Sequence, residues 1–212
     1  MVKRCVCFFI LLFVYCLSFA DDGLKKVKSI SEEYYDLLFD KNKVGKVRLE
    51  TYMGNYRGKE FFVIEEEMEA KFLRGGVEMK TYNKSRTLSN HRDLEPFVYW
   101  YESNEGGEKR TIFGLIRKEN NKKILNLEID IGGAKTTKEI EIPSDAIFSN
   151  AFEIFIRRNL EVGFSAKRHL IMESDADVVE GTTQVDRFEP VDVCPNSVYK
   201  TTTIVAGIKN VE

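Results

Sequence analysis

The chain has 212 residues, with 32 basic and 34 acidic side chains and a formal net charge of −2 at pH 7. This balance leaves no basic excess to neutralise a phosphate backbone, which argues against a nucleic acid as partner. The length suits one domain that buries a core of its own.

The first twenty residues have the pattern of a cleavable signal peptide. Lys3 and Arg4 precede the apolar run 5–17, and residues 18–20 end in the small-x-small pattern of a signal peptidase site. The run is shorter than the ~20 residues that a membrane-spanning helix needs, so no stable transmembrane anchor is expected. We therefore expect an exported protein, periplasmic or secreted, with the signal peptide at 1–20. Residues 21–212 then form a single β-rich domain, or the N-terminal part of a longer protein.

The cysteines predict a mature domain without an intrachain disulfide. Cleavage at residue 20 removes Cys5, Cys7 and Cys16, which leaves Cys194 alone. An exported protein meets an oxidising compartment, yet one cysteine has no partner within its own chain. We interpret Cys194 as a small buried hydrophobe rather than as a reactive thiol. The stability of the domain must then come from its core.

Most of the remaining chain alternates apolar and polar residues with a period of two, which is typical of half-buried strands. In the clearest segment, Phe62, Ile64 and Met68 share one side, whereas Glu65 and Glu67 share the other. Turns rich in glycine and asparagine, including one at 54–58, separate neighbouring segments and indicate antiparallel hairpins. The predicted strands are 33–39, 44–52, 62–72, 77–88, 96–102, 109–118, 125–131, 139–142, 166–174, 182–188 and 198–205.

Glu66 is the unusual residue of this pattern. It has the parity of Phe62 and Ile64, so in a regular strand it points toward the apolar side. An isolated carboxylate there is costly unless it is paired or in contact with water. Two explanations stay open: Glu66 faces a solvated cavity, or a β-bulge switches the parity of the strand.

The segment 96–101 carries large side chains on both faces, because Phe97, Tyr99 and Tyr101 alternate with Val98 and Trp100. Such a strand is usually central in its sheet or covered by a neighbouring layer. An ordinary core position is therefore the simpler interpretation. The functional alternative is a lining for a lipid-like ligand, or a docking patch.

One segment departs from the strand pattern. Residues 145–160 place apolar side chains, among them Phe152 and Phe155, at the three- and four-residue spacing of an amphipathic helix. Ser144 is the predicted N-cap, and Gly163 is the predicted stop. The apolar stripe must be buried, and the concave face of a curved sheet is the natural place for it. The sequence predicts an α+β fold: a strongly curved antiparallel β-sheet, or half-open barrel, with one covering amphipathic helix.

Familiar catalytic motifs are absent from the sequence, including the nucleophile elbow, the H-E-x-x-H motif, the paired C-x-x-C and the phosphate-binding loops. His91 is expected in a solvated loop and His169 at the rim of a strand, and two histidines are too few donors for a metal site. We therefore predict no catalytic residue, no metal site and no cofactor. A hydrolase that uses Glu66, Asp93 and Glu95 ranks last, because no spacing singles out a pair of carboxylates.

Two tracts resemble a class of exported bacterial domains of unknown function. The first is the aromatic-rich segment 34–39 with 43–47, and the second is 142–147 with the following helix and 160–163. Similar domains occur ahead of transglutaminase-like catalytic domains, and their fold looks like the half-barrel of lipoprotein-localisation factors. The resemblance implies an apolar concavity suited to acyl chains or apolar peptide segments. A transglutaminase-like peptidase needs cysteine, histidine and aspartate in that order, and no histidine follows Cys194.

The sequence thus predicts a non-enzymatic exported envelope domain that binds an apolar ligand, such as a lipid or acyl chain, or a partner protein in a half-barrel concavity. The alternative is an accessory N-terminal domain of a transglutaminase-like cysteine peptidase whose catalytic domain is absent from this chain. The candidate ligand-binding residues are Phe62, Ile64, Glu66, Met68, Tyr99, Trp100, Phe152 and Phe155.

Overall fold

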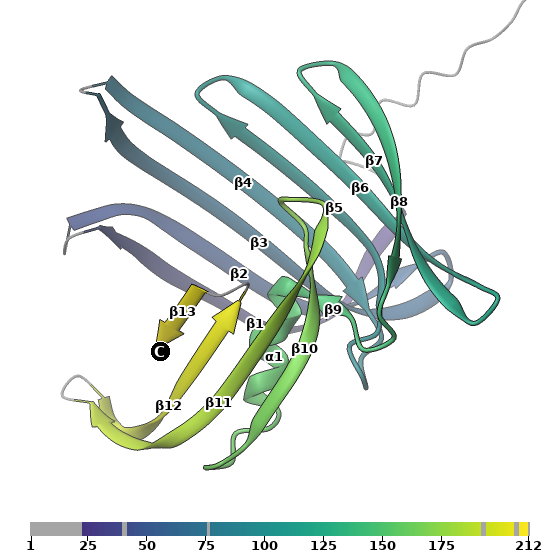
Figure 1. The fold of residues 1–212 in the computed structure, drawn as a ribbon. Helices are drawn as coiled ribbons and strands as arrows, with labels where there is room; N and C mark the ends of the chain where they lie inside the picture. Colours follow the sequence, from purple (N-terminus) through teal and green to yellow (C-terminus); the bar gives the residue numbers. More distant parts are fainter. Residues whose placement is uncertain (1–22, 40–41, 76, 192–193, 206–207, 212) are drawn as a thin grey trace, which may run out of the picture.

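The protein is described by a computed structural model that covers residues 23–39, 42–75, 77–191, 194–205 and 208–211. The predicted signal peptide, 1–20, lies outside these residues. The described chain forms two β-sheets and one helix, α1 (Ser149–Arg157) (Figure 1). The large sheet consists of β1 (Leu24–Phe39), β2 (Asn42–Tyr56), β3 (Lys59–Arg74), β4 (Val77–Ser89), β5 (Pro96–Glu105), β6 (Glu108–Glu119), β7 (Lys122–Ile131) and β8 (Ala134–Ile142). The second sheet consists of β9 (Ile147–Phe148), β10 (Ser165–Met172), β11 (Asp177–Val191), β12 (Cys194–Val205) and β13 (Ile208–Val211).

In the large sheet, each strand pairs antiparallel with the next one along the chain. Tight hairpins connect these neighbouring strands. In four of the hairpins, both turn residues have a positive φ. Such turns match the right-handed twist of the strands that they join. The four turns are Arg57-Gly58, Gly106-Gly107, Asn120-Asn121 and Gly132-Gly133.

Two hairpin boundaries differ from the prediction. β2 continues through Gly54 to Tyr56, so the turn expected at 54–58 is reduced to Arg57-Gly58. β1 begins at Leu24 rather than at residue 33, and it pairs with β2 through three register shifts. These irregularities disturb the alternation of apolar and polar residues, which is why the sequence pattern missed the first part of β1.

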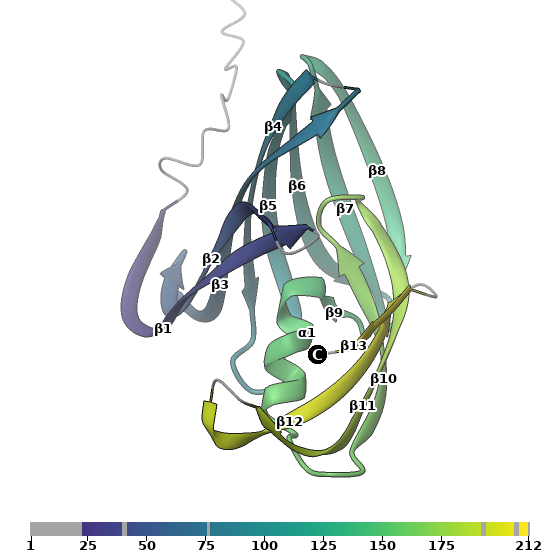
Figure 2. The same cartoon turned by 90° about the vertical axis from the view of Figure 1, so that its left-hand side faces the viewer.

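The second sheet packs with α1 against one end of the large sheet. Figures 1 and 2 show α1 between β1–β3 on one side and β10–β13 on the other, while the far ends of β3–β8 extend beyond both. β9 pairs parallel with β10, through Leu170 with Ile147 and Ile171 with Phe148. The other strand pairs of this sheet are antiparallel.

The helix is shorter than predicted. It covers 149–157 rather than 145–160, because Ile147 and Phe148 are taken up as strand β9 and are fully buried. Phe148 occupies the N-cap position without a side-chain hydrogen bond, so the predicted Ser144 cap is wrong. Gly163 does not end the helix, which stops at Arg157, but it adopts a positive φ in the connection that follows.

The buried side chains form two clusters, one on each face of the large sheet. The concave cluster joins strands of the large sheet to α1 and the second sheet, with Tyr99, Phe148 and Ile171 among its fully buried members. The convex cluster contains side chains of the large sheet that alternate along their strands with those of the concave cluster. Its buried members are Tyr52, Tyr56, Val63, Leu88, Val98 and Trp100.

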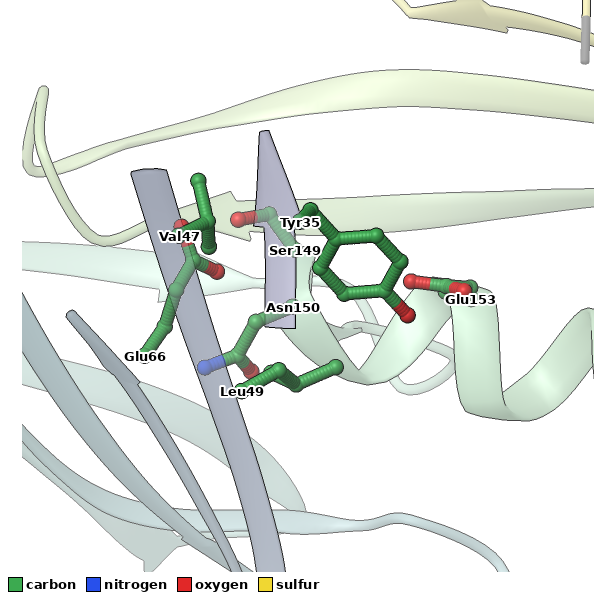
Figure 3. A pocket seen from close by; sticks show the side chains of 7 residues that line it. All are labelled: Tyr35, Val47, Leu49, Glu66, Ser149, Asn150 and Glu153. Carbon is green, nitrogen blue, oxygen red and sulfur yellow. The ribbon is translucent and has the colours of Figure 1, made fainter. Parts of the chain in front are cut away.

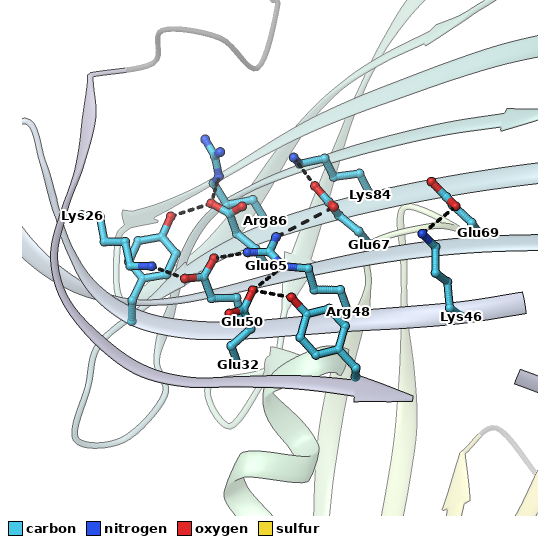
Figure 4. Close-up of polar contacts among 12 residues, drawn as sticks. Lys26, Glu32, Lys46, Arg48, Glu50, Glu65, Glu67, Glu69, Lys84 and Arg86 are labelled. Carbon is cyan, nitrogen blue, oxygen red and sulfur yellow. Dashed lines mark hydrogen bonds and ion pairs between the residues drawn. The ribbon is translucent and has the colours of Figure 1, made fainter. Parts of the chain in front are cut away.

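Three glutamates of β3, Glu65, Glu67 and Glu69, lie on the convex face, where a band of ion pairs crosses β1–β4 (Figure 4). Each glutamate there meets a basic side chain from a neighbouring strand, so the run neutralises lysines and arginines on a solvent-facing surface. Exposed pairs such as Glu69 with Lys46 stabilise a fold only slightly, whereas Glu65 and Arg86 are 11% and 13% exposed and are less screened by solvent. The pairs from β3 are Glu65 with Arg86 at 2.8 Å, Glu67 with Lys84 at 2.5 Å and Glu69 with Lys46 at 3.1 Å.

The predicted fold class is confirmed. The described residues form a strongly curved antiparallel sheet that does not close into a barrel, together with a single amphipathic helix on its concave side. The second sheet is an addition that the sequence pattern did not predict as a separate layer. Within the described residues, no helix combines the length and the hydropathy that crossing a membrane would require.

Candidate functional site

A cavity of about 500 Å³ opens on the concave side of the large sheet, beside the first turn of α1. Figure 3 shows Glu66 at one side of this cavity and Glu153 at the other, with Tyr35 between them. The residues that line it are Tyr35, Val47, Leu49, Glu66, Ser149, Asn150 and Glu153. We call this space the outer cavity.

A second, smaller cavity of about 170 Å³ shares Glu66, Ser149 and Asn150 with the outer one. It continues toward the end of β10, and polar side chains dominate its wall. The residues that line it are Glu66, Asn83, Ser85, Tyr101, Ser149, Asn150, Glu173 and Ser174. We call this space the inner cavity.

Glu66 lies on the wall that the two cavities share. β3 pairs with β2 and β4 without a register shift from Phe62 to Ala70, so no bulge switches the parity of the strand. Glu66 therefore points to the concave side, between Leu49 of β2 and Ser85 of β4. Burial, and the nearby negative charge of Glu153, raise the pKa of its carboxyl. The structure thus supports the cavity explanation for this residue.

Glu173 follows β10 and lines the inner cavity with only 5% of its surface exposed. Ser149 donates a hydrogen bond to its Oε2, while its Oε1 has no hydrogen-bond partner among the described protein groups. Burial raises the pKa of this carboxyl to about 7, and the charge of Glu66 acts in the same direction. Hydrogen bonds from Ser149 and from the backbone of Asn150 oppose that rise without cancelling it.

Asn150, in the first turn of α1, joins the helix to the large sheet. Thr87 of β4 donates a 3.0 Å hydrogen bond to the Asn150 Oδ1. The Asn150 Nδ2 is buried and has no partner among the described residues. Two neighbouring groups of this wall, the Glu173 Oε1 and the Asn150 Nδ2, therefore keep unused hydrogen-bonding capacity, which native proteins seldom leave inside a core.

On the side of the outer cavity away from Glu66, Arg157 of α1 binds side chains of β1 and of its own helix. Its guanidinium donates to both carboxylate oxygens of Glu33 in β1, at 2.9 and 3.0 Å, and to the Tyr35 hydroxyl at 3.1 Å. Arg157 also binds Glu153 one turn earlier in the helix. This guanidinium lowers the pKa of Glu33 and neutralises Glu153. The carboxylates of Glu66 and Glu173, by contrast, make no ion pair with a basic side chain in the described chain.

The structure gathers some of the predicted ligand-binding residues and separates others. Glu66 lines both cavities, and Met68 lies half-buried two residues further along the same face. Four others, Phe62, Ile64, Tyr99 and Phe152, are buried in the concave core, and Phe155 packs against that core.

Of the predicted site residues only Glu66 lines a cavity, and Trp100 lies on the opposite face of the sheet. It belongs to the convex cluster, because it alternates along β5 with Tyr99 and Tyr101. Tyr101, which the prediction left out, lines the inner cavity instead. The alternation itself pointed to this outcome, since neighbouring residues of a strand face opposite sides.

Sequence reasoning missed Ser149, Asn150 and Glu173, which complete the site. Ser149 and Asn150 lie within the longer helix predicted for 145–160, and nothing in that pattern singled them out. Glu173 had a signal similar to that of Glu66: it follows the buried Leu170 and Ile171 and has the parity of Ile171.

The other carboxylates and the histidines of the prediction lie elsewhere. Glu95 forms ion pairs with Lys118 at 2.9 Å and with Lys123 at 3.0 Å. Glu95 lies next to Pro96, at the start of β5. The residue of β5 that aligns with Glu66 across the sheet is Tyr101, roughly 17 Å from Pro96 along the strand.

His169 pairs with Asp145 at 2.8 Å, a partner that the prediction did not identify because it placed Asp145 in the helix. The ring of His91 is exposed beside Phe62, at 5.8 Å between centroids.

Taken together, the geometry defines an open, β-barrel-like α+β domain with a carboxylate-lined cavity beneath its helix. No protein-family model and no curated protein matches the chain. A crystal structure of a β-barrel-like protein of a domain of unknown function, DUF1849, from Brucella abortus is similar in fold, with a TM-score of 0.57. The two sequences are 13% identical, and the match covers 85% of this chain and 81% of the other. This likeness shows the fold alone, so the resemblance to lipoprotein-localisation factors and the link to transglutaminase-like proteins stay predictions.

Proposed function

We propose that the protein is a non-enzymatic, exported binding domain that takes the apolar part of a small ligand into its outer cavity. The observation that carries this proposal is the cavity itself, whose volume of about 500 Å³ falls within the usual range for ligand sites. The proposal places the protein in the bacterial envelope, on the strength of the signal peptide predicted at 1–20.

The walls of the outer cavity suit an amphiphile better than a purely apolar molecule. Tyr35, Val47 and Leu49 offer an apolar surface from β1 and β2, while Glu66 and Asn150 offer polar groups on the other side. Ligand sites commonly combine an apolar lining with a few fixed polar groups that orient the ligand.

A cavity-filling substitution tests the proposal. Val47→Trp places an indole in the outer cavity, whereas Lys46→Trp puts the same side chain on the convex face one residue earlier. Binding of the neutral dye N-phenyl-1-naphthylamine, and its displacement by octanol, would be followed by fluorescence titration. We expect Val47→Trp to weaken dye binding at least about tenfold, with Lys46→Trp close to the unsubstituted protein.

Two results would overturn the proposal. The first is an absence of dye binding and of octanol binding by the unsubstituted, folded protein. The second is equal loss of binding in Val47→Trp and Lys46→Trp, because the dye would then bind outside the cavity. Circular dichroism of both variants verifies that each one is folded.

A further inference from the structure

The charge of the cavity walls restricts the kind of polar group that a ligand can bring. The ionisable residues on the two walls are the carboxylic residues Glu66, Glu153 and Glu173 and the phenols Tyr35 and Tyr101. Among the residues that the structure describes, no lysine, arginine or histidine lines either cavity. An anionic head group would therefore meet carboxylic side chains of like charge at these walls, which disfavours its binding. Arg110 lies outside both linings, although its positive charge acts on Tyr101.

Two of these carboxylic groups lack a positive partner. Glu153 is bound by Arg157 at the rim, whereas Glu66 and Glu173 have no ion pair with a basic residue of the described chain. Glu173 is the more deeply buried of the two, at 5% exposure, and its Oε1 lacks a hydrogen-bond donor. A buried carboxylate that lacks a donor is costly, so a donor supplied by a ligand would stabilise it.

The polar side chains around Glu66 in the inner cavity can accept further hydrogen bonds. Ser85 and Asn83 of β4 share the inner cavity with Glu66, and the Tyr101 ring lies on the same wall. A primary ammonium group has three N–H donors and no acceptor, and aromatic rings attract such cations. The acceptors of this wall thus match an ammonium group in charge and in hydrogen-bond direction, whereas the buried Asn150 Nδ2, a donor without a partner among the described residues, is not satisfied by it.

A metal ion fits this wall less well. Hard divalent cations such as Ca²⁺ take six to eight oxygen ligands, several of them usually carboxylates. In the part of the chain that the structure describes, no three or more aspartate, glutamate, histidine or cysteine side chains come together in a way that could hold an ion. An organic cation places less demand on ligand number, because its own carbon skeleton is held by the apolar walls.

We propose that the inner cavity binds the primary ammonium group of an amphiphilic amine, with Glu66 and Glu173 as its acceptors and the aliphatic part of the ligand in the outer cavity. This inference rests on the proposed binding function and specifies its ligand class. The two cavities share Glu66, Ser149 and Asn150, so one ligand can occupy both.

Three probes with the same chain length separate the contributions of charge and chain. Octylamine, octanol and octanoate would be titrated into the purified full chain at pH 7.5 by calorimetry. We expect octylamine to bind at least about tenfold more tightly than octanol, and octanoate to bind most weakly. Glu66→Gln and Glu173→Gln should each reduce the preference for octylamine over octanol toward unity.

Glu128→Gln is the matched control, because Glu128 is exposed on the other face of the sheet and should keep the full preference. Equal affinity for octylamine and octanol overturns this inference and leaves the proposed function standing. Failure of all three probes to bind overturns the proposed function. A preference for octylamine that survives in both Glu66→Gln and Glu173→Gln shows that the amine is recognised elsewhere and also overturns the inference.

Discussion

Replacing Glu173 with glutamine should remove a pH-dependent contribution from the free energy of unfolding. Burial raises the pKa of this carboxyl from 4.5 to about 7. Between these two values the unfolded chain has released the proton while the folded protein still holds it. The unfolded state then binds fewer protons, so stability falls as the pH rises. The stability that Glu173 contributes is therefore fully present below pH 4.5 and is lost as the pH rises through about 7.

The magnitude follows from the interval between the two pKa values. Each pH unit corresponds to about 1.4 kcal/mol, so the complete loss is about 3 kcal/mol. About 2.5 kcal/mol of it falls between pH 5 and pH 8. The Glu173 side chain is only 5% exposed, so solvent screening reduces this value little.

Urea denaturation of the unsubstituted protein and of Glu173→Gln at pH 5 and pH 8 measures this contribution. The other titrating groups are common to both proteins, so the difference in unfolding free energy between them isolates Glu173. We expect this difference to shift by about 2.5 kcal/mol in favour of the variant from pH 5 to pH 8. Glu128→Gln should show no such shift, because that side chain is exposed. A difference that stays constant within about 0.5 kcal/mol refutes the reasoning.

The remaining predictions concern ligand affinity, core packing and the tryptophan. Octylamine affinity measured by calorimetry should fall from pH 8 to pH 5. The pKa values of Glu66 and Glu173 are raised, so both carboxyls become neutral as the pH falls, and a rise in affinity would contradict this reasoning. Gly114→Ala should lower the urea-derived unfolding free energy by about 1–3 kcal/mol, since a Cβ there would lie 2.1 Å from the Tyr99 Cε1, and unchanged stability would count against the packing. Trp100, the only tryptophan of the sequence, is 6% exposed on the convex face, so its fluorescence should be blue-shifted and insensitive to saturating octylamine.

Local alternation carried enough information to place most strands and one wall of the site. The segment 62–72 forms part of β3 in the expected orientation, because most of its residues obey the period of two and no bulge intervenes. Glu66 could be identified for the same reason: a carboxylate on the apolar side of a regular strand needs a special environment. The sequence could not show that this environment includes the first turn of α1.

What could not be predicted depends on contacts between distant segments. Ile147 and Phe148 fit a helical pattern, but pairing with β10 holds them as a strand, a choice that residues more than twenty positions away decide. The same holds for Glu173, whose carboxyl acquires its environment only when Ser149 of α1 donates to it. Periodicity in the sequence describes one secondary-structure element at a time. The conformation of these residues depends on contacts between two elements, so periodicity could not predict it.

The strand order of the large sheet has a consequence for the order in which the protein folds. Each of its strands pairs with its neighbour in sequence, so the sheet can grow hairpin by hairpin with short loop closures. The wall formed by Glu66 and Ser85 belongs to this early part of the chain, whereas Ser149, Asn150 and Glu173 come later. The cavity is therefore completed only when the C-terminal segments dock, and a ligand that bridges the two halves would favour the last step of folding.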